Sequence, residues 1–243
     1  MNPVAFITGA SGGIGRACAL KLAAEGFDIA GTYFSDEKSA AELENRINSA
    51  GGRCRMYKLD VSDPAQVKTV TGQVEADFGG IYAAVNCAGA ALNKLFQDTS
   101  DDDFERINGI NFKGVFNVCR ECTSLLLKNH KGCIINISSM WGIKGASCEV
   151  LYSATKAAII GLTKALAREL APSGIRVNCI APGAVDTKMN DNLTPADKAV
   201  LCEEIPLSRF GTAQEIAEVA AFLASEKSSY ITAQVITADG GLI

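Results

Sequence analysis

Short apolar runs alternate with amphipathic segments along the whole chain. Each apolar run has the length of a buried strand, and in the amphipathic segments apolar residues recur near the 3.6-residue period of a helix. The expected strands span residues 4–8, 27–33, 54–59, 81–86, 134–137, 176–180 and 234–237. Strands that alternate with helices form βαβ units, whose parallel strands are covered on both faces. The pattern therefore predicts an α/β fold with a doubly wound parallel sheet of seven strands.

The expected helices are marked by their ends as well as by their period. Residues 152–171 repeat Ala and Leu at helical spacing, and Pro172 and Gly174 follow where a helix should stop. Further helices are expected over residues 37–50, from residue 64 onward, and over residues 101–129. The last of these would carry Asn108 and Asn111 on one long helix.

The chain is expected to form one domain. It has 243 residues, 48% of them hydrophobic, which is enough to bury a core on both faces of a sheet. Since no repeat, low-complexity tract or linker divides it, the domain should span residues 1–243. Residues 184–208 are polar and contain Pro195 and Pro206, so we expect them to form a mobile lid above the strand ends.

The charge pattern limits the expected partners and location. The net charge is −4 and there is no run of Lys and Arg, so neither nucleic acid nor an anionic membrane surface is an expected partner. The N-terminus lacks a positive segment followed by an apolar core, and we find no apolar span of about 18 residues. These features predict a soluble, cytoplasmic protein without a membrane-spanning segment.

The nine cysteines are scattered rather than arranged as a framework. Most lie in apolar contexts, where a free thiol packs as a small hydrophobic group in a reducing compartment. Cys119 and Cys122 have motif spacing, but they lie in a predicted helix and no second pair completes a zinc site. We therefore expect no metal. The single histidine, His130, has no nucleophile elbow with which to form a catalytic triad.

A glycine-rich turn, Gly9 to Gly15, follows the first expected strand and precedes a helix. Glycines in such a turn let backbone N–H groups approach a pyrophosphate at the positive end of the helix. A plain loop could have the same composition, but the strand-turn-helix context favours dinucleotide binding. Other polar or small residues follow later strands and should share the same sheet edge: Asp60, Asn86 to Gly89, Ser139, and Pro182 with Gly183.

Tyr152 and Lys156 stand four residues apart on a predicted helix, so their side chains project from one face. A cation close to a phenol favours the phenolate and lowers its pKa from about 10 toward neutrality, which suits acid/base chemistry. Ser139 could then hold a substrate oxygen beside the phenol. The alternative, a surface Tyr and Lys on an amphipathic helix, is common for so short a motif.

These motifs occur together in one order over nearly the whole chain: Thr8-Gly9-x-x-x-Gly13-x-Gly15, Asp60-Val61, Asn86-x-Ala88-Gly89, Asn111, Ser139, Tyr152-x-x-x-Lys156, and Pro182-Gly183 with Thr187. In this the sequence resembles the short-chain dehydrogenase/reductase family. The resemblance implies a Rossmann-type fold and hydride transfer to a ketone. It also implies Tyr152 as general acid, Ser139 on the carbonyl oxygen and Lys156 on the nicotinamide ribose. Asn111 would continue the proton relay, with Asn108 the weaker candidate.

The same resemblance implies a nicotinamide dinucleotide cofactor. Its expected contacts are Gly9, Ser11, Gly12, Gly13, Ile14, Gly15, Tyr33, Ser35, Asp60, Val61, Asn86, Ala88, Gly89, Tyr152, Lys156, Pro182, Gly183, Val185 and Thr187. Members that use NADP often carry Arg or Lys where this chain has Gly12, and members that use NAD often end the second strand with Asp. Here that strand ends without a carboxylate, and Ser35 and Lys38 follow. We therefore expect NADPH, with NADH less favoured.

Within the family, two subgroups compete as models for the substrate. The segment from Ile205 to Gly211 and the C-terminal tail resemble 3-oxoacyl-(acyl-carrier-protein) reductases, which implies a thioester on acyl carrier protein and a homotetramer. In such a tetramer Cys119 and Cys122 would lie on one face of an interface helix. Those reductases bind the acidic carrier protein with arginines just before the fifth strand and just after the helix of Tyr152 and Lys156. This chain has His130 and Ser173 at those two positions, and Lys128 and Lys131 could partly replace the missing arginines.

The loop from Ser139 to Val150 resembles a second subgroup, the reductases of the 5-aminopentanone adduct on elongation factor P. Trp141 and Glu149 would face the substrate, and Glu149 would pair with an ammonium group, although a solvated glutamate is the simpler reading. A third reading, a dinucleotide sensor without activity, is disfavoured because Asn111, Ser139, Tyr152 and Lys156 are all present.

Overall fold

The computed structural model describes residues 2–190 and 193–243. Its strands are β1 (Val4–Thr8), β2 (Asp28–Tyr33), β3 (Cys54–Lys58), β4 (Ala83–Asn86), β5 (Gly132–Ile137), β6 (Ile175–Pro182), β7 (Val185–Asp186), β8 (Gly211–Thr212) and β9 (Val235–Ala238). Its α-helices are α1 (Gly13–Ala24), α2 (Glu37–Ser49), α3 (Pro64–Phe78), α4 (Asp101–Asn108), α5 (Gly114–Asn129), α6 (Trp141–Lys144), α7 (Val150–Leu170), α8 (Pro195–Glu204) and α9 (Ala213–Ala224).

The main sheet has seven parallel strands in the order β3-β2-β1-β4-β5-β6-β9. The prediction of a Rossmann-type, doubly wound sheet is thereby confirmed. The strand order reverses between β1 and β4, and a ligand crevice forms beyond the carboxyl ends of strands at such a reversal. The short pair β7 and β8, which the sequence pattern did not predict, forms a second sheet.

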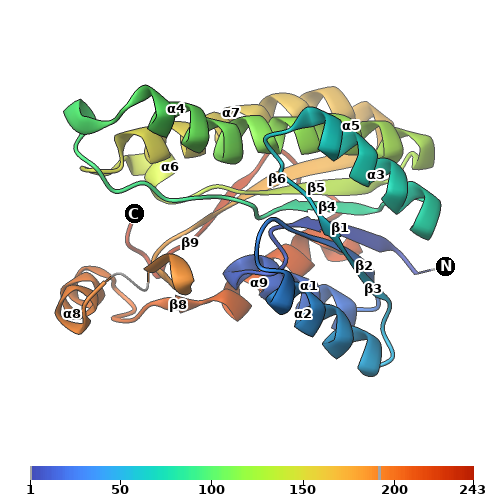
Figure 1. The fold of residues 1–243 in the computed structure, drawn as a ribbon, viewed down its shortest axis with the longest axis horizontal. Helices are drawn as coiled ribbons and strands as arrows, with labels where there is room; N and C mark the ends of the chain where they lie inside the picture. Colours follow the sequence, from blue (N-terminus) through green and yellow to red (C-terminus); the bar gives the residue numbers. More distant parts are fainter. Residues whose placement is uncertain (1, 191–192) are drawn as a thin grey trace.

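Helices cover both faces of the sheet (Figure 1). One face packs against α3, α5 and α7, in a core that includes Phe6, Val74 and Ile159. The other face packs against α1, α2 and α9, with Ile7, Leu22 and Ile216 in its core. Two apolar layers therefore enclose the strands, which explains why the central strands β1, β4 and β5 are buried at every position rather than at alternate ones.

The expected helix over residues 101–129 is divided by a π-helical turn, Gly109–Lys113, between α4 and α5. A Cβ on Gly114 would lie 2.6 Å from Val61 Cγ2, so a glycine is required where α5 begins against the segment after β3. The wide turn includes Asn111, which is fully buried. Turns of this kind often mark functional sites, and a 3.6-residue pattern does not reveal them.

Two expectations about α7 and α5 differ from the structure. Contrary to the sequence analysis, Val150–Ser173 is long and apolar enough by length and composition to cross a membrane. It packs against β6 and buries Lys156 and Ile159, as a core helix does. Cys119 and Cys122 are 2% and 0% exposed and face the core, not an interface.

The expected lid over residues 184–208 contains β7, a 3₁₀ turn at Lys188–Asn190 and the capped helix α8. It is therefore more regular than its polar sequence indicated. Residues 191 and 192 lie outside the described residues. Its movement as a lid stays a prediction.

Candidate active site

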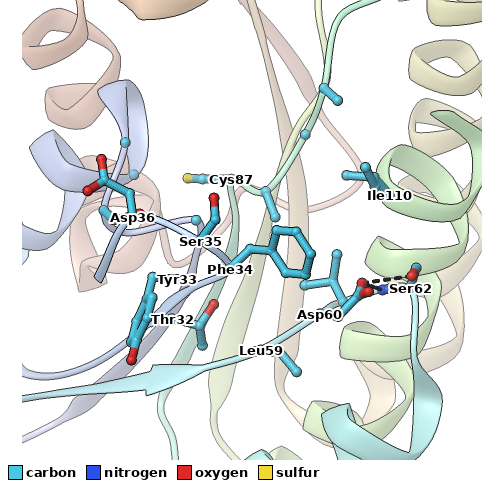
Figure 2. Close-up of a pocket in the computed structure, with 18 of the residues that line it drawn as sticks. Thr32, Tyr33, Phe34, Ser35, Asp36, Leu59, Asp60, Ser62, Cys87 and Ile110 are labelled. Atoms are coloured by element: carbon cyan, nitrogen blue, oxygen red, sulfur yellow. Dashed lines mark hydrogen bonds between the residues drawn. The ribbon is translucent and has the colours of Figure 1, made fainter. Parts of the chain in front are cut away.

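A cavity of about 950 Å³ opens at the switch point, beyond the ends of β1, β2 and β4 (Figure 2). Its size is that of a site for a large cofactor. Thirteen of the expected cofactor contacts line it: Gly9, Ser11, Gly12, Gly13, Ile14, Gly15, Tyr33, Ser35, Asp60, Val61, Ala88, Gly89 and Thr187. The topology thus gathers segments that are far apart in the sequence around one space.

The glycine turn fits a pyrophosphate group. Gly9 has a φ of +65°, and a Cβ on Gly15 would collide with the Gly9 carbonyl oxygen, so both positions require glycine. Gly12 is the N-cap of α1 and supplies no side-chain cap, and the first turn holds no acidic residue. The N–H groups at this helix end are therefore free to donate hydrogen bonds to an anion, and the helix dipole also favours a negative charge there.

Apart from Tyr152 and Lys156, four expected contacts do not line the cavity. Asn86 is 1% exposed and donates from Nδ2 to Asn136 Oδ1 at 2.8 Å, inside the core. Pro182 accepts a backbone hydrogen bond from Met140, Gly183 packs against Asp239, and Val185 is buried. These residues shape the strand ends that support the cavity.

Tyr152 and Lys156 lie together near the start of α7, where they are 8% and 5% exposed. Lys156 Nζ is 5.6 Å from the centre of the Tyr152 ring and donates to the Ile137 carbonyl oxygen at 3.0 Å. A Cβ built on Gly89, which lines the cavity, would lie 3.5 Å from Lys156 Nζ. The expected acid/base pair therefore adjoins the cavity, although neither side chain is part of its lining.

Ser139 and Ser138 follow β5 and have different roles. The Ser139 hydroxyl oxygen accepts from the Trp141 backbone N–H at 3.1 Å, and the effect of Ser139 on the Tyr152 phenol is to lower the phenol pKa. Ser138 Oγ donates to the Lys156 carbonyl oxygen at 2.8 Å. Ser139 is thus aligned with the phenol, while Ser138 attaches α7 to the strand end.

We expected Lys156 to lower the pKa of the Tyr152 phenol, but in this structure that pKa is raised. Burial raises the pKa of Tyr152 to about 12, assisted by the Glu149 carboxylate and opposed by Ser139. Burial also lowers the pKa of Lys156 to about 8. Desolvation is the largest cause of both shifts, because removal from water disfavours the charged form of each group. At neutral pH the phenol is therefore protonated, as a proton donor must be.

Asn111 connects the segment after β4 to α7. Its Oδ1 accepts from Ala90 N at 2.8 Å, and its Nδ2 donates to Ala90 O at 2.9 Å and to Thr155 Oγ1 at 3.2 Å. Asn108, the weaker candidate for the relay, lines the cavity instead. The π-helical turn therefore directs the two asparagines to different places.

The two expected substrate residues are half-buried at the two ends of the segment 141–149, which contains α6 and the loop before α7. Trp141 begins α6, and Glu149 is the N-cap position of α7. Burial raises the pKa of Glu149, and its carboxylate makes no hydrogen bond or ion pair with any residue that the structure describes. The loop is held by a 2.7 Å hydrogen bond from Lys94 N to the Cys148 carbonyl oxygen.

The cavity also has lining residues that sequence reasoning missed. Phe34 is 63% exposed, and Asp36 and Lys188 border the turn after β2. Lys38, which we expected near the cofactor, is exposed on α2 and does not line the cavity. The expectation that no carboxylate lies at this end is wrong as well, because Asp36 does. Its role as N-cap of α2 was the available signal.

Within the residues that the structure describes, no group of three His, Cys, Asp or Glu side chains is placed to hold a metal ion. The chemistry available at the site is that of a buried phenol, a hydroxyl and an ammonium beside an anion-binding turn. Such a set can hold a dinucleotide and deliver a proton. The fold and this site define a dinucleotide-binding oxidoreductase.

Comparisons with known proteins agree with this class. A family model described as "Enoyl-(Acyl carrier protein) reductase" matches residues 9–243. The chain belongs to the short-chain dehydrogenase/reductase family, as its motifs predicted. It is 40% identical over 242 residues to "3-oxoacyl-[acyl-carrier-protein] reductase FabG" of Staphylococcus aureus strain Mu50, covering 100% of this chain and 98% of that protein.

Two further proteins are similar over their full length. The "Uncharacterized oxidoreductase YmfI" of Bacillus subtilis strain 168 is 40% identical over 242 residues, which are 99% of each chain. A crystal structure of a dehydrogenase/reductase from Sinorhizobium meliloti 1021 superposes with a TM-score of 0.93 at 34% identity. The match covers 99% of this chain and 94% of that one.

Proposed function

We propose that this protein reduces the ketone of a 3-oxoacyl chain carried on acyl carrier protein, with NADPH as the reductant. The observation that carries the proposal is the convergence of Ser139, Tyr152 and Lys156 beside a dinucleotide-sized cavity. The 40% identity to a 3-oxoacyl-[acyl-carrier-protein] reductase over the whole chain supports this substrate class.

Each side chain has a distinct part in this reaction. The nicotinamide supplies the hydride when the cofactor is bound. Tyr152 holds a proton at neutral pH and donates it to the carbonyl oxygen, which the Ser139 hydroxyl orients. Lys156 places a positive charge next to the cofactor cavity. Asn111 fixes the segment after β4 and is our candidate for continuing the proton relay.

A second candidate substrate, the 5-aminopentanone adduct on elongation factor P, is favoured by Glu149. This carboxylate is half-buried, has no partner among the described residues and acts on the Tyr152 phenol. An ammonium group on the substrate would pair with it, and a fatty acyl chain has none. On the carrier side, the expected substitute cations are already paired, Lys128 with Glu75 and Lys131 with Glu226.

One experiment separates the two substrates. NADPH oxidation is measured with a 3-oxoacyl thioester on carrier protein and, in parallel, with aminopentanone-modified elongation factor P. Turnover of the thioester that Glu149→Gln does not change supports the first candidate. Turnover of the modified factor alone, with KM raised about tenfold in Glu149→Gln, supports the second.

The control for this experiment is Glu169→Gln, which alters an exposed glutamate on the same helix. It should behave as the unmodified protein with either substrate. If NADPH binds and neither ketone is reduced, both substrate proposals are wrong. The hypothesis of a dinucleotide sensor without activity would then replace them.

We also propose a homotetramer that works in the cytoplasm. All nine cysteines are free thiols, as is usual in a reducing compartment. The edge strand β9 is half-exposed, and Phe116 and Leu127 expose apolar surface on α5. An unpaired edge and an exposed apolar helix face are the features that subunit contacts cover.

A further inference from the structure

The two sides of the dinucleotide cavity are joined by an ion pair. Asp36 stands in the turn after β2, and Lys188 begins the 3₁₀ turn after β7. Lys188 Nζ lies 3.6 Å from Asp36 Oδ2, and both residues line the cavity. The ion pair therefore spans the cavity at the end that is bordered by the turn after β2.

The turn after β2 is the place where dinucleotide-binding folds read the ribose 2′ position. An acidic residue about 20 residues beyond the glycine motif binds the 2′-hydroxyl of NAD, and a cation nearby accommodates the 2′-phosphate of NADP. Asp36 has the sequence distance of the acidic residue. The two members of this ion pair thus have opposite preferences for the two cofactors.

Among the described residues that line the cavity, Lys188 is the cation placed beside Asp36. The other cations among the described lining residues, Arg106 and Lys113, come from α4 and the π-helical turn that follows it. Arg106 lies 3.7 Å from Asp103. Gly12, at the position where relatives often carry a cation, has no side chain to contribute.

The exposure of this ion pair allows the Lys188 ammonium to leave Asp36 for another anion. The side chains of Lys188 and Asp36 are 83% and 41% exposed, and an exposed ion pair is held weakly. Asp36 also accepts a hydrogen bond from Ser39 N at 3.1 Å, which keeps the carboxylate in place when the lysine leaves. A phosphate monoester carries up to two negative charges and attracts the ammonium more strongly than a carboxylate does.

We propose that Lys188 is the residue that selects NADPH, by transferring its ammonium from Asp36 to the 2′-phosphate, and that Asp36 opposes this choice. This inference rests on the proposed use of NADPH. It assigns cofactor selection to the segment after β7 rather than to the glycine turn. The Asp36 carboxylate then sets a limit on the preference for NADPH over NADH.

The test is calorimetric titration of the full chain with NADPH, NADH and adenosine 2′,5′-bisphosphate. Lys188→Gln should weaken binding of NADPH and of the bisphosphate about fivefold and leave NADH unchanged. Lys188→Arg should restore both. Asp36→Asn should strengthen NADPH binding and weaken NADH binding. Lys198→Gln is the matched control, because Lys198 forms a similar exposed pair with Asp186 and does not line the cavity.

The outcomes separate this inference from the proposed function. If the unmodified chain binds NADPH and Lys188→Gln binds it equally well, the inference is wrong and the proposed function stands. Equal losses for NADPH and NADH would also overturn it, because they indicate a general structural effect. A chain that binds NADH and rejects NADPH would overturn both the cofactor assignment and the inference.

Discussion

The Lys156 ammonium nitrogen lies 5.6 Å from the centre of the Tyr152 ring and donates a 3.0 Å hydrogen bond to the Ile137 carbonyl oxygen. The helix sets the spacing of the two side chains, and the strand end sets the direction of the lysine. Because both groups are buried, the phenol holds its proton tightly and the ammonium is held at a cost in stability.

Removal of the Tyr152 hydroxyl should abolish catalysis and preserve cofactor binding. In Tyr152→Phe we expect kcat to fall at least about 100-fold, because the proton donor is lost while the ring that packs beside Lys156 remains. Steady-state kinetics and calorimetric titration with NADPH measure the two effects. Tyr82→Phe is the control, since Tyr82 hydrogen-bonds Glu226 at the opposite end of the sheet. An active Tyr152→Phe variant would contradict the assignment.

Lys156 should make stability depend on pH. Its folded pKa of about 8 lies below its ordinary value of 10.5, so the unfolded chain binds more protons in that interval. The contribution of Lys156 to the free energy of unfolding should therefore rise with pH from about 8 to about 10.5, by roughly 3 kcal/mol. Denaturant unfolding of the unmodified chain and of Lys156→Met at both limits isolates the contribution.

As pH rises from about 8 to about 10.5, the unmodified chain should gain stability relative to Lys156→Met. At neutral pH, Lys156→Met should be the more stable protein, because no ammonium has to be desolvated. A difference that stays constant with pH would show that the lysine is not the titrating group.

Gly142 keeps α6 in contact with the backbone of α7. A Cβ at this position would lie 2.7 Å from the Lys156 carbonyl carbon and 2.8 Å from Ser138 Oγ, and the backbone contact cannot yield cheaply. In Gly142→Ala we expect a loss of about 1–3 kcal/mol in stability, and kcat/KM reduced up to about 100-fold through displacement of Lys156. Thermal unfolding and kinetics measure these changes.

Gly161→Ala provides the matched control on α7. No atom lies within 4 Å of a Cβ built there, so the substitution should stabilise the helix by about 0.5–1 kcal/mol. If both alanine variants behaved alike, the close packing at Gly142 would not be responsible for the loss.

The proposed tetramer predicts that α5 is covered by another subunit. Phe116 and Leu127 are eleven residues apart, about three turns, and so lie on the same face of α5, 43% and 37% exposed. Phe116→Arg should shift the mass measured by light scattering from tetramer toward dimer or monomer, because a charge would be buried at the contact. Leu207→Arg, at an exposed apolar residue outside α5, is the control. An unchanged mass would exclude this face from the interface.

The sequence determined the order of strands and helices, because burial on both faces of a sheet requires continuous apolar runs. It also determined many of the residues that line the cavity, since Gly9, Asp60 and Ala88 each lie within two residues of a strand end, and parallel strands end at one edge. Tyr152 and Lys156 could be paired from spacing alone, because a helix brings residues i and i+4 to one face.

The tertiary structure decided how those residues behave. Burial, which depends on every neighbouring element, reversed the expected pKa shift of Tyr152. The π-helical turn separated Asn111 from Asn108, and no local pattern encodes it. Asp36 and Lys188 are 152 positions apart, and only the return of the chain after β7 brings them together across the cavity. Spacing along the chain predicts local faces, whereas desolvation and long-range pairs depend on how the faces pack.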